Sequence, residues 1–220
     1  MKCKAMVFDA YGTLFDVHSV SKRCEELWPG RGLSVSQLWR VKQLGYTWQR
    51  SLMGRYEDFQ RITEEALRYV CATLNLESGG GQVQTLMDEY LKLATFPETA
   101  GALAQFGKRR LAILSNGSPS MLEPLVENAG LGSVFSSVLS VDSLRVYKPD
   151  PRVYQLAVDA LGVSAASIGF VSSNCWDACG AGAFGFNTFW INRNGAPVDA
   201  LGVTPDHIVN SLDEVPPLLS

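Results

Sequence analysis

Short apolar runs alternate with amphipathic stretches along most of this chain. Five runs are rich in β-branched or aromatic residues and are bounded by Gly, Ser, Asn or Asp, which is typical of buried strands. They lie at residues 4–10, 110–116, 134–142, 167–173 and 186–193. The stretches between them include two that start near a proline, carry apolar residues at helical spacing and end near a glycine, as helices do. This alternation predicts an α/β fold with a parallel sheet.

The stretch 17–96 breaks the alternation, because it holds no convincing strand run. Two long segments within it are amphipathic with a helical period. Its glycine-rich residues 77–82 are typical of a loop and not of a phosphate cradle, since no Lys-Ser/Thr pair follows the glycines. We therefore expect a helical cap domain at 17–96, inserted into an α/β core domain made of 1–16 and 97–220.

Composition excludes several classes of protein. The chain has 220 residues, is 46% hydrophobic and carries a formal net charge of -3, which describes an ordinary globular protein with a sizeable core. Its basic cluster at 107–110 suits a helix end, where positive charge complements the dipole, so no nucleic-acid partner is expected. Since no apolar run approaches the length of a membrane span, no membrane partner is expected either.

The five cysteines are scattered and odd in number, which favours free thiols in a reducing compartment. The first residues hold too short an apolar stretch for a secretory signal, so we expect a cytoplasmic protein. Cys175 and Cys179 stand four apart, but neither His18 nor His207 is near them in sequence. Because a four-ligand metal set is missing, we interpret the two cysteines as packing thiols.

Polar residues gather where the predicted strands end. These residues are Asp9, Ser115, Asn116, Lys148, Ser172, Asn174 and Asp177. An open parallel sheet binds ligands outside the carboxyl ends of its strands, so we expect these groups to meet at one edge. Neither histidine stands at such a position and no G-x-S-x-G motif is present, which disfavours serine-hydrolase chemistry. A carboxylate is the better nucleophile candidate, because it can form an ester that water then cleaves.

Four motifs follow one another at appropriate separation along the chain. They are "DAYGT" at 9–13, "LSNGS" at 114–118, "YKPDP" at 147–151 and "VSSNCWD" at 171–177. With "LWRVKQLGYTW" in the expected cap, the whole chain resembles the haloacid dehalogenase superfamily and, within it, the L-2-haloacid dehalogenases. The resemblance implies a Rossmann-like parallel sheet core with an inserted helical cap, and a homodimer without a cofactor. It also implies hydrolysis of (S)-2-haloacids to (R)-2-hydroxyacids and halide.

The resemblance assigns a role to each site residue. Asp9 would attack C2 of the substrate with inversion, and water would then cleave the resulting ester at the Asp9 carbonyl. The implied catalytic residues are Asp9, Thr13, Lys148, Tyr154, Ser172, Asn174 and Asp177. The implied substrate-binding residues are Ala10, Tyr11, Arg40, Ser115 and Asn116, with Arg40 as the halide acceptor. Leu44, Phe59 and Trp176 are pocket candidates.

Phosphatases of the same superfamily are the alternative enzyme. They carry a second aspartate two residues after the nucleophile, because expelling an alkoxide requires a general acid. This chain has Tyr11 there, which suits a halide, since a halide leaves without a proton. Phosphatases also build a Mg²⁺ site partly from a Gly-Asp pair, whereas this chain has Ser172 and Ser173 at those positions. We therefore expect a metal-independent dehalogenase, with a catalytically silent binding protein of the same fold as the remaining alternative.

Two cap positions depart from the family's pattern. Val41 stands where a polar residue commonly follows the cap arginine, and Gly45 stands where a Glu precedes the next tyrosine. We expect a more apolar cap to change chain-length preference or tolerance for fluoride, chloride or bromide.

Overall fold

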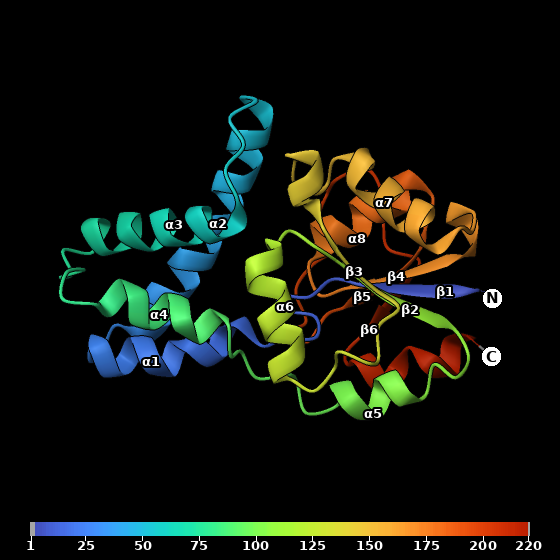
Figure 1. The fold of residues 1–220 in the computed structure, drawn as a ribbon, viewed down its shortest axis with the longest axis horizontal. Coiled ribbons are helices and arrows are strands. Elements are labelled where there is room, and N and C mark those ends of the chain that lie inside the picture. Colours follow the sequence, from blue (N-terminus) through green and yellow to red (C-terminus); the bar gives the residue numbers. More distant parts are fainter. Residues whose placement is uncertain (1–2, 220) are drawn as a thin grey trace.

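The computed structural model describes residues 3–219 and contains a six-stranded parallel sheet in those residues (Figure 1). The strands lie in the order β3-β2-β1-β4-β5-β6. Their bounds are β1 Ala5–Phe8, β2 Arg110–Ser115, β3 Ser137–Ser140, β4 Ile168–Ser172, β5 Asn187–Ile191 and β6 His207–Val209. Each of the five apolar runs contains one strand, so the predicted α/β class is confirmed. The pattern misses β6, because its three residues are too few to form an apolar run.

The strand order creates a crevice at β1. This strand pairs in parallel with β2 on one side and with β4 on the other. The chain proceeds outward through β2 and β3, crosses back to β4, and then continues to β5 and β6. The carboxyl ends of β1, β2 and β4 therefore flank the topological switch point, where open α/β sheets bind ligands.

Helices cover the sheet on both faces. They are α5 Thr99–Ala104, α6 Pro119–Asn128, α7 Pro151–Leu161 and α8 Cys175–Phe184. In Figure 1, α7 and α8 lie above the sheet, and α5 lies below it. Local signals set the bounds of α7, because the Asp150 side chain accepts from the Arg152 N–H at 3.0 Å and Gly162 ends the helix at a φ of 59°.

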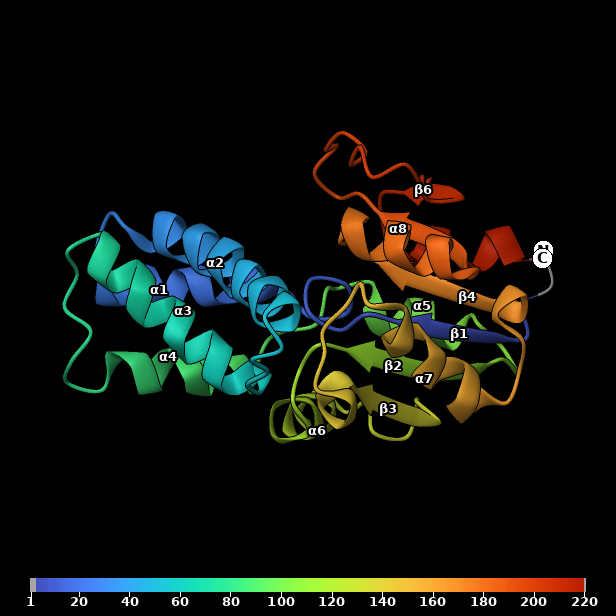
Figure 2. The same cartoon turned by 90° about the horizontal axis from the view of Figure 1, so that it is seen from above.

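Four further helices form a bundle at one end of the molecule (Figure 2). They are α1 Val20–Leu27, α2 Gly32–Leu52, α3 Phe59–Thr73 and α4 Gln82–Tyr90. The chain enters and leaves the bundle side by side, since the Asp16 N–H donates to the Ala94 carbonyl at 2.8 Å and the Phe96 N–H donates to the Leu14 carbonyl at 3.1 Å. We propose 17–96 as the limits of a cap domain built on this bundle.

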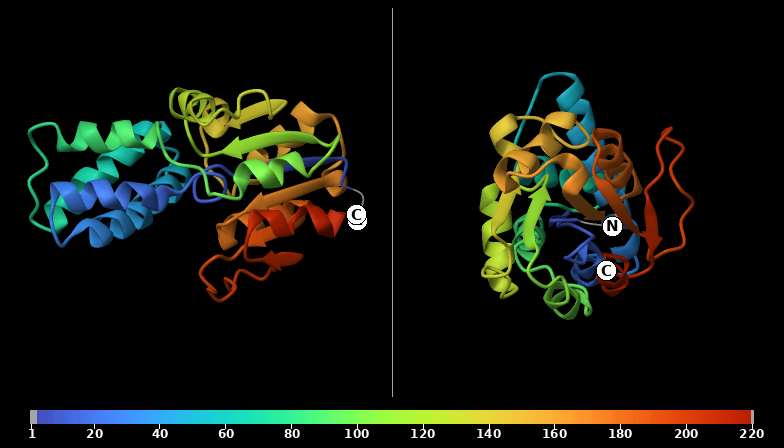
Figure 3. Two further views of the ribbon diagram at one scale, coloured as in Figure 1. Left: turned by 90° about the horizontal axis from the view of Figure 1, so that it is seen from below. Right: turned by 90° about the vertical axis from the view of Figure 1, so that its right-hand side faces the viewer.

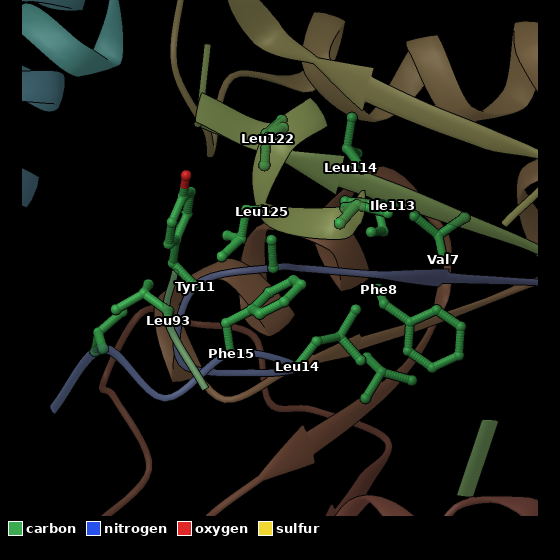
Figure 4. Packing of buried hydrophobic residues seen from close by; sticks show 14 of the residues in the cluster. Val7, Phe8, Tyr11, Leu14, Phe15, Leu93, Ile113, Leu114, Leu122 and Leu125 are labelled. Atoms are coloured by element: carbon green, nitrogen blue, oxygen red, sulfur yellow. The ribbon is translucent and has the colours of Figure 1, made fainter. Parts of the chain in front are cut away.

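The apolar core is continuous from the sheet to the bundle. Figure 4 shows side chains of β1 and β2 packed beside Leu14 and Phe15 of the segment after β1 and beside Leu122 of α6. Tyr11 and Leu93 extend this cluster toward the helices. The described chain begins and ends at the end of the sheet that lies away from the bundle (Figure 3). The loop after β1 is therefore anchored at the boundary between sheet and bundle, where it carries Asp9.

Candidate active site

Asp9 directly follows β1, and hydrogen bonds hold both its backbone and its carboxylate. Its backbone N–H donates to the Val171 carbonyl at 2.9 Å. Its Oδ1 accepts from Lys148 Nζ at 3.1 Å, and its Oδ2 accepts from Asn174 Nδ2 at 3.0 Å and from Thr13 Oγ1 at 3.2 Å. The residue is only 6% exposed. The carboxylate is therefore oriented by three donors and largely shielded from water.

Lys148 joins the two carboxylates that the strand-end pattern selected. Its Nζ lies 3.1 Å from Asp9 Oδ1 and 2.8 Å from Asp177 Oδ2, and the side chain is buried. Burial alone would lower the pKa of Lys148, but the charges of Asp177 and Asp9 outweigh it and raise that pKa. The ammonium group is thus a fixed positive charge between two carboxylates. The backbone N–H of Lys148 donates to Asn116 Oδ1 at 3.1 Å, which ties Lys148 to the end of β2.

Asp177 lies in the first turn of α8 and is fully buried. Burial raises its pKa from 3.8 to about 6, although the charge of Lys148 works in the opposite direction. Its Oδ1 accepts from the Tyr154 hydroxyl at 2.9 Å. Burial and the charge of Asp177 raise the pKa of Tyr154, so that hydroxyl remains a donor. Asp177 therefore holds its proton more strongly than an ordinary aspartate does, inside a hydrogen-bonded network.

Short polar side chains fix the loops around Asp9. Thr13 Oγ1 accepts from the Ser173 N–H at 2.9 Å, which leaves its proton free to reach Asp9. Ser172 Oγ accepts from the Asn174 N–H at 3.1 Å and orders the turn before α8. Gly12 has a φ of 89°, and a Cβ there would lie 3.0 Å from Ser173 Oγ. Glycine is therefore the residue that this turn accepts without strain.

Donors without an intramolecular acceptor face the same edge. Ser115 ends β2, Asn116 follows it, and both are buried. Ser115 Oγ accepts from the Gly117 N–H at 3.1 Å. The backbone N–H groups of Ala10 and Tyr11 have no hydrogen-bond partner in residues 3–219. The buried hydroxyl of Tyr11 also lacks one in those residues, and burial raises its pKa, so it stays protonated. This edge can therefore receive an anionic ligand.

Arg40 reaches the site from α2 in the bundle. Its Nη2 lies 3.4 Å from the Tyr11 carbonyl, and its Nη1 donates to Gln43 Oε1 at 2.8 Å. It lines a cavity of about 270 Å³ together with Leu44, Asn174 and residues that follow β5. The bundle thus brings a guanidinium group to the carboxyl ends of the strands.

The three pocket candidates do not share one cavity. Leu44 lines the cavity beside Arg40. Phe59 is buried with its ring centroid 5.5 Å from that of Tyr11. Trp176 packs against Trp48 at 5.3 Å and lines a second cavity of about 530 Å³.

The effect expected of Val41 and Gly45 on substrate range stays a prediction, and neither residue lines the cavity beside Arg40. Val41 is 69% exposed, and a Cβ added at Gly45 would meet nothing within 4 Å. A helix turns by about 100° per residue, so the neighbour of Arg40 in sequence points away from the face that Arg40 uses. These two positions therefore do not make the described site more apolar.

Sequence reasoning missed Arg193 and Gln43. Arg193 Nη1 donates to the Gly12 carbonyl at 3.1 Å, and Nη2 contacts Glu98 Oε1 at 2.8 Å. It follows β5 by two residues, so the strand-end rule could have selected it. Gln43 is buried one helical turn after Arg40, a spacing that places both on one face of α2.

The predicted packing thiols Cys175 and Cys179 are buried, with their sulfur atoms 3.9 Å apart.

Comparisons with known proteins agree with this geometry. A family model described as haloacid dehalogenase-like hydrolase matches residues 3–185. An (S)-2-haloacid dehalogenase of Pseudomonas sp. (strain YL) is 54% identical over 96% of this chain and 92% of its own. Haloacetate dehalogenase H-2 of Moraxella sp. (strain B) is 48% identical over 100% of this chain and 99% of its own. A structure of the L-2-haloacid dehalogenase from Xanthobacter autotrophicus with chloropropionic acid covalently bound is 42% identical, covers 98% of each chain and has a TM-score of 0.92.

Proposed function

This chain belongs to the haloacid dehalogenase-like hydrolases and, among them, to the L-2-haloacid dehalogenases, and from this membership we propose how its residues act. The reaction is hydrolysis of an (S)-2-haloacid to an (R)-2-hydroxyacid and halide. One observation carries the proposal: Asp9, Lys148 and Asp177 form a buried ion cluster at the sheet edge to which the bundle delivers Arg40. That arrangement supplies a nucleophile, a base and two positive charges.

Asp9 is the nucleophile. One carboxylate oxygen attacks C2 from the side opposite the halogen, so the new C–O bond forms as the carbon–halogen bond breaks and configuration inverts. The halide leaves with the bonding electron pair. The low exposure of Asp9 supports this role, because a dry site leaves the carboxylate less solvated. Arg40 stabilises the charge that develops on the halide.

Water then cleaves the ester at the carbonyl carbon of Asp9. Asp177 takes a proton from this water, and its pKa of about 6 suits a base that works near neutral pH. Lys148 stabilises the negative charge on the ester oxygen during the attack. As the ester C–O bond breaks, the protonated Asp177 returns its proton to the alkoxide oxygen, so that the neutral hydroxyl of the product forms. The hydroxyacid leaves, the second proton of the water is released to solvent, and the carboxylate of Asp9 is restored with one oxygen from water.

The substrate carboxylate binds at the ends of β1 and β2. The N–H groups of Ala10 and Tyr11 and the buried polar groups of Ser115 and Asn116 are its donors. These donors have no other acceptor within residues 3–219, which supports this assignment, because an unpaired buried donor gains most from a ligand. Binding there places C2 between Asp9 and the cap.

The reaction does not require a metal ion. A haloacid carries one negative charge, which Lys148, Arg40 and the free amide donors offset. Ser172 and Ser173 stand where a phosphatase has a Gly-Asp pair, so one hard ligand for Mg²⁺ is missing. Halide release should be unchanged after EDTA treatment and should not rise with added Mg²⁺. Activity lost with EDTA and restored by Mg²⁺ would exclude this part of the proposal.

Assembly and location are further parts of the proposal. Leu38, Val41 and Tyr69 are exposed apolar side chains on α2 and α3, which supports a homodimer that buries them. All five cysteines are free, which supports a cytoplasmic protein. No helix in residues 3–219 is long and apolar enough to cross a membrane. Sedimentation at a monomer mass would exclude the dimer.

The decisive experiment is halide release from separate L and D enantiomers of 2-chloropropionate. We expect release from the L enantiomer alone, with D-lactate as product. Asp9→Asn should abolish release while the protein stays folded, because the amide is a poor nucleophile. A folded wild-type protein that releases no halide from any 2-haloacid would refute the proposal.

A further inference from the structure

The guanidinium group of Arg40 is held by a side chain that does not itself touch Asp9. Arg40 Nη1 donates to Gln43 Oε1 at 2.8 Å. Gln43 lies one turn further along α2 and has no exposed surface. An arginine on a helix facing a cavity has many rotamers, and this bond restricts them. The direction of the remaining N–H groups therefore depends on Gln43.

The amide of Gln43 is itself oriented by α3. Gln43 Nε2 lies 2.7 Å from Thr63 Oγ1, and the Thr63 hydroxyl lies 2.6 Å from the Phe59 carbonyl. A carbonyl can only accept, so the Thr63 proton points to Phe59 and its oxygen accepts from Gln43. The amide nitrogen must then face Thr63, and the amide oxygen must face Arg40. The relay from Phe59 to Arg40 thus has one consistent direction.

The neutral amide has an electrostatic advantage over a carboxylate at this position. Glu at position 43 would also accept from Arg40, but its negative charge would cancel much of the field of the guanidinium group in this buried setting. Gln43 orients the cation and leaves its charge available to a ligand. A buried amide with both ends paired does this without an unsatisfied polar group.

We propose that Gln43 is a positioning residue that aims Arg40 at the leaving halide and thereby sets the leaving-group preference. This inference rests on the proposed function of Arg40. Chloride is a poorer leaving group than bromide, so its departure depends more on stabilisation by Arg40. Loss of the relay should therefore slow dechlorination more than debromination.

The test compares kcat/KM for L-2-chloropropionate and L-2-bromopropionate in wild type and Gln43→Met. We expect the bromide-to-chloride ratio to rise about fivefold or more in the variant, since a hydrogen bond to a charged group is lost. Thr63→Val should raise the ratio in the same direction by a smaller factor, because it frees the amide to rotate. Thr47→Val is the matched control, since Thr47 is buried on α2 and its hydroxyl donates to the Leu44 carbonyl of the same helix. Its ratio should stay at the wild-type value.

Chloride binding gives a readout independent of turnover. We expect ³⁵Cl NMR line broadening to show weaker chloride binding in Gln43→Met than in wild type. An unchanged ratio and unchanged binding in a folded Gln43→Met protein would overturn the inference. Equal slowing with both substrates would also overturn it, because that is the signature of a purely structural role. A wild-type protein that turns over no haloacid, but whose chloride binding weakens in Gln43→Met, would instead refute the proposed function alone.

Discussion

Replacing Lys148 by methionine removes the ammonium group between Asp9 and Asp177 while keeping most of the side-chain volume. The two N–O distances are 3.1 and 2.8 Å. At an effective dielectric constant of about 20 they correspond to about 5 and about 6 kcal/mol of Coulomb attraction. Burying the ammonium group costs the folded wild type several kcal/mol of lost hydration, and the methionine variant does not carry this cost. We therefore expect a net loss of about 3–5 kcal/mol in the free energy of unfolding at about pH 8.

The loss should shrink at lower pH. Burial raises the pKa of Asp177 from 3.8 to about 6 in the wild type, and removing the charge of Lys148 raises it further. When the folded-state pKa of a carboxyl lies above its ordinary value, its protonation stabilises the folded state. This stabilisation is complete at pH values below the ordinary pKa and is lost as pH rises through the folded-state pKa. The deficit of the variant should therefore be smaller at about pH 5 than at about pH 8.

Urea unfolding followed by tryptophan fluorescence measures the free energy of unfolding at each pH. Lys148→Met with Asp177→Asn is the matched control, because it removes the second carboxylate together with the cation. That double variant should regain about half or more of the lost stability and lose most of the pH dependence. A deficit below about 1 kcal/mol, or one equal at both pH values, would refute the buried ion cluster as the source.

Other predictions concern neighbouring groups. The pKa of about 6 for Asp177 predicts that steady-state kcat rises with pH through about 6. Tyr154→Phe removes the donor 2.9 Å from Asp177 Oδ1 and should move this limb upward by about one unit; an unmoved limb would argue against Asp177 as the base. Tyr11→Phe deletes a buried hydroxyl without a partner in the described residues and should leave stability unchanged or raise it by up to about 2 kcal/mol in denaturant titrations, whereas a clear loss would contradict that reading. Arg193→Met should cost about 2–3 kcal/mol by the same measurement, because its donors bond Gly12 and Thr13, and Arg152→Met on the exposed surface should cost almost nothing.

The meeting of Asp9, Lys148 and Asp177 was predictable from sequence. Each follows or lies near the end of a predicted strand or its connecting loop, and parallel strands present their carboxyl ends at one edge. The lack of a histidine at this edge then favoured a carboxylate nucleophile, and the resemblance of the motifs to a known family implied that Asp9 takes this role. The fold class and this edge therefore followed from the apolar pattern and the strand-end residues.

The face of α2 that serves the site was predicted less well. Val41 is next to Arg40 in sequence and was expected to influence the pocket, yet its side chain is exposed. Gln43 was overlooked, although helical spacing puts it beside Arg40. The orientation of the Gln43 amide depends on Thr63 of α3, and no local pattern in α2 identifies that partner.

The sequence by itself determined where strands and helices form and which chemical groups end each strand, because periodicity, prolines and glycines act over a few residues. Only the tertiary structure decided which groups pair. Lys148 meets Asp9 across 139 residues of chain, and burial of the cluster moves the pKa of Asp177 to about 6. Distance and desolvation control both effects, and both arise only when distant segments pack together.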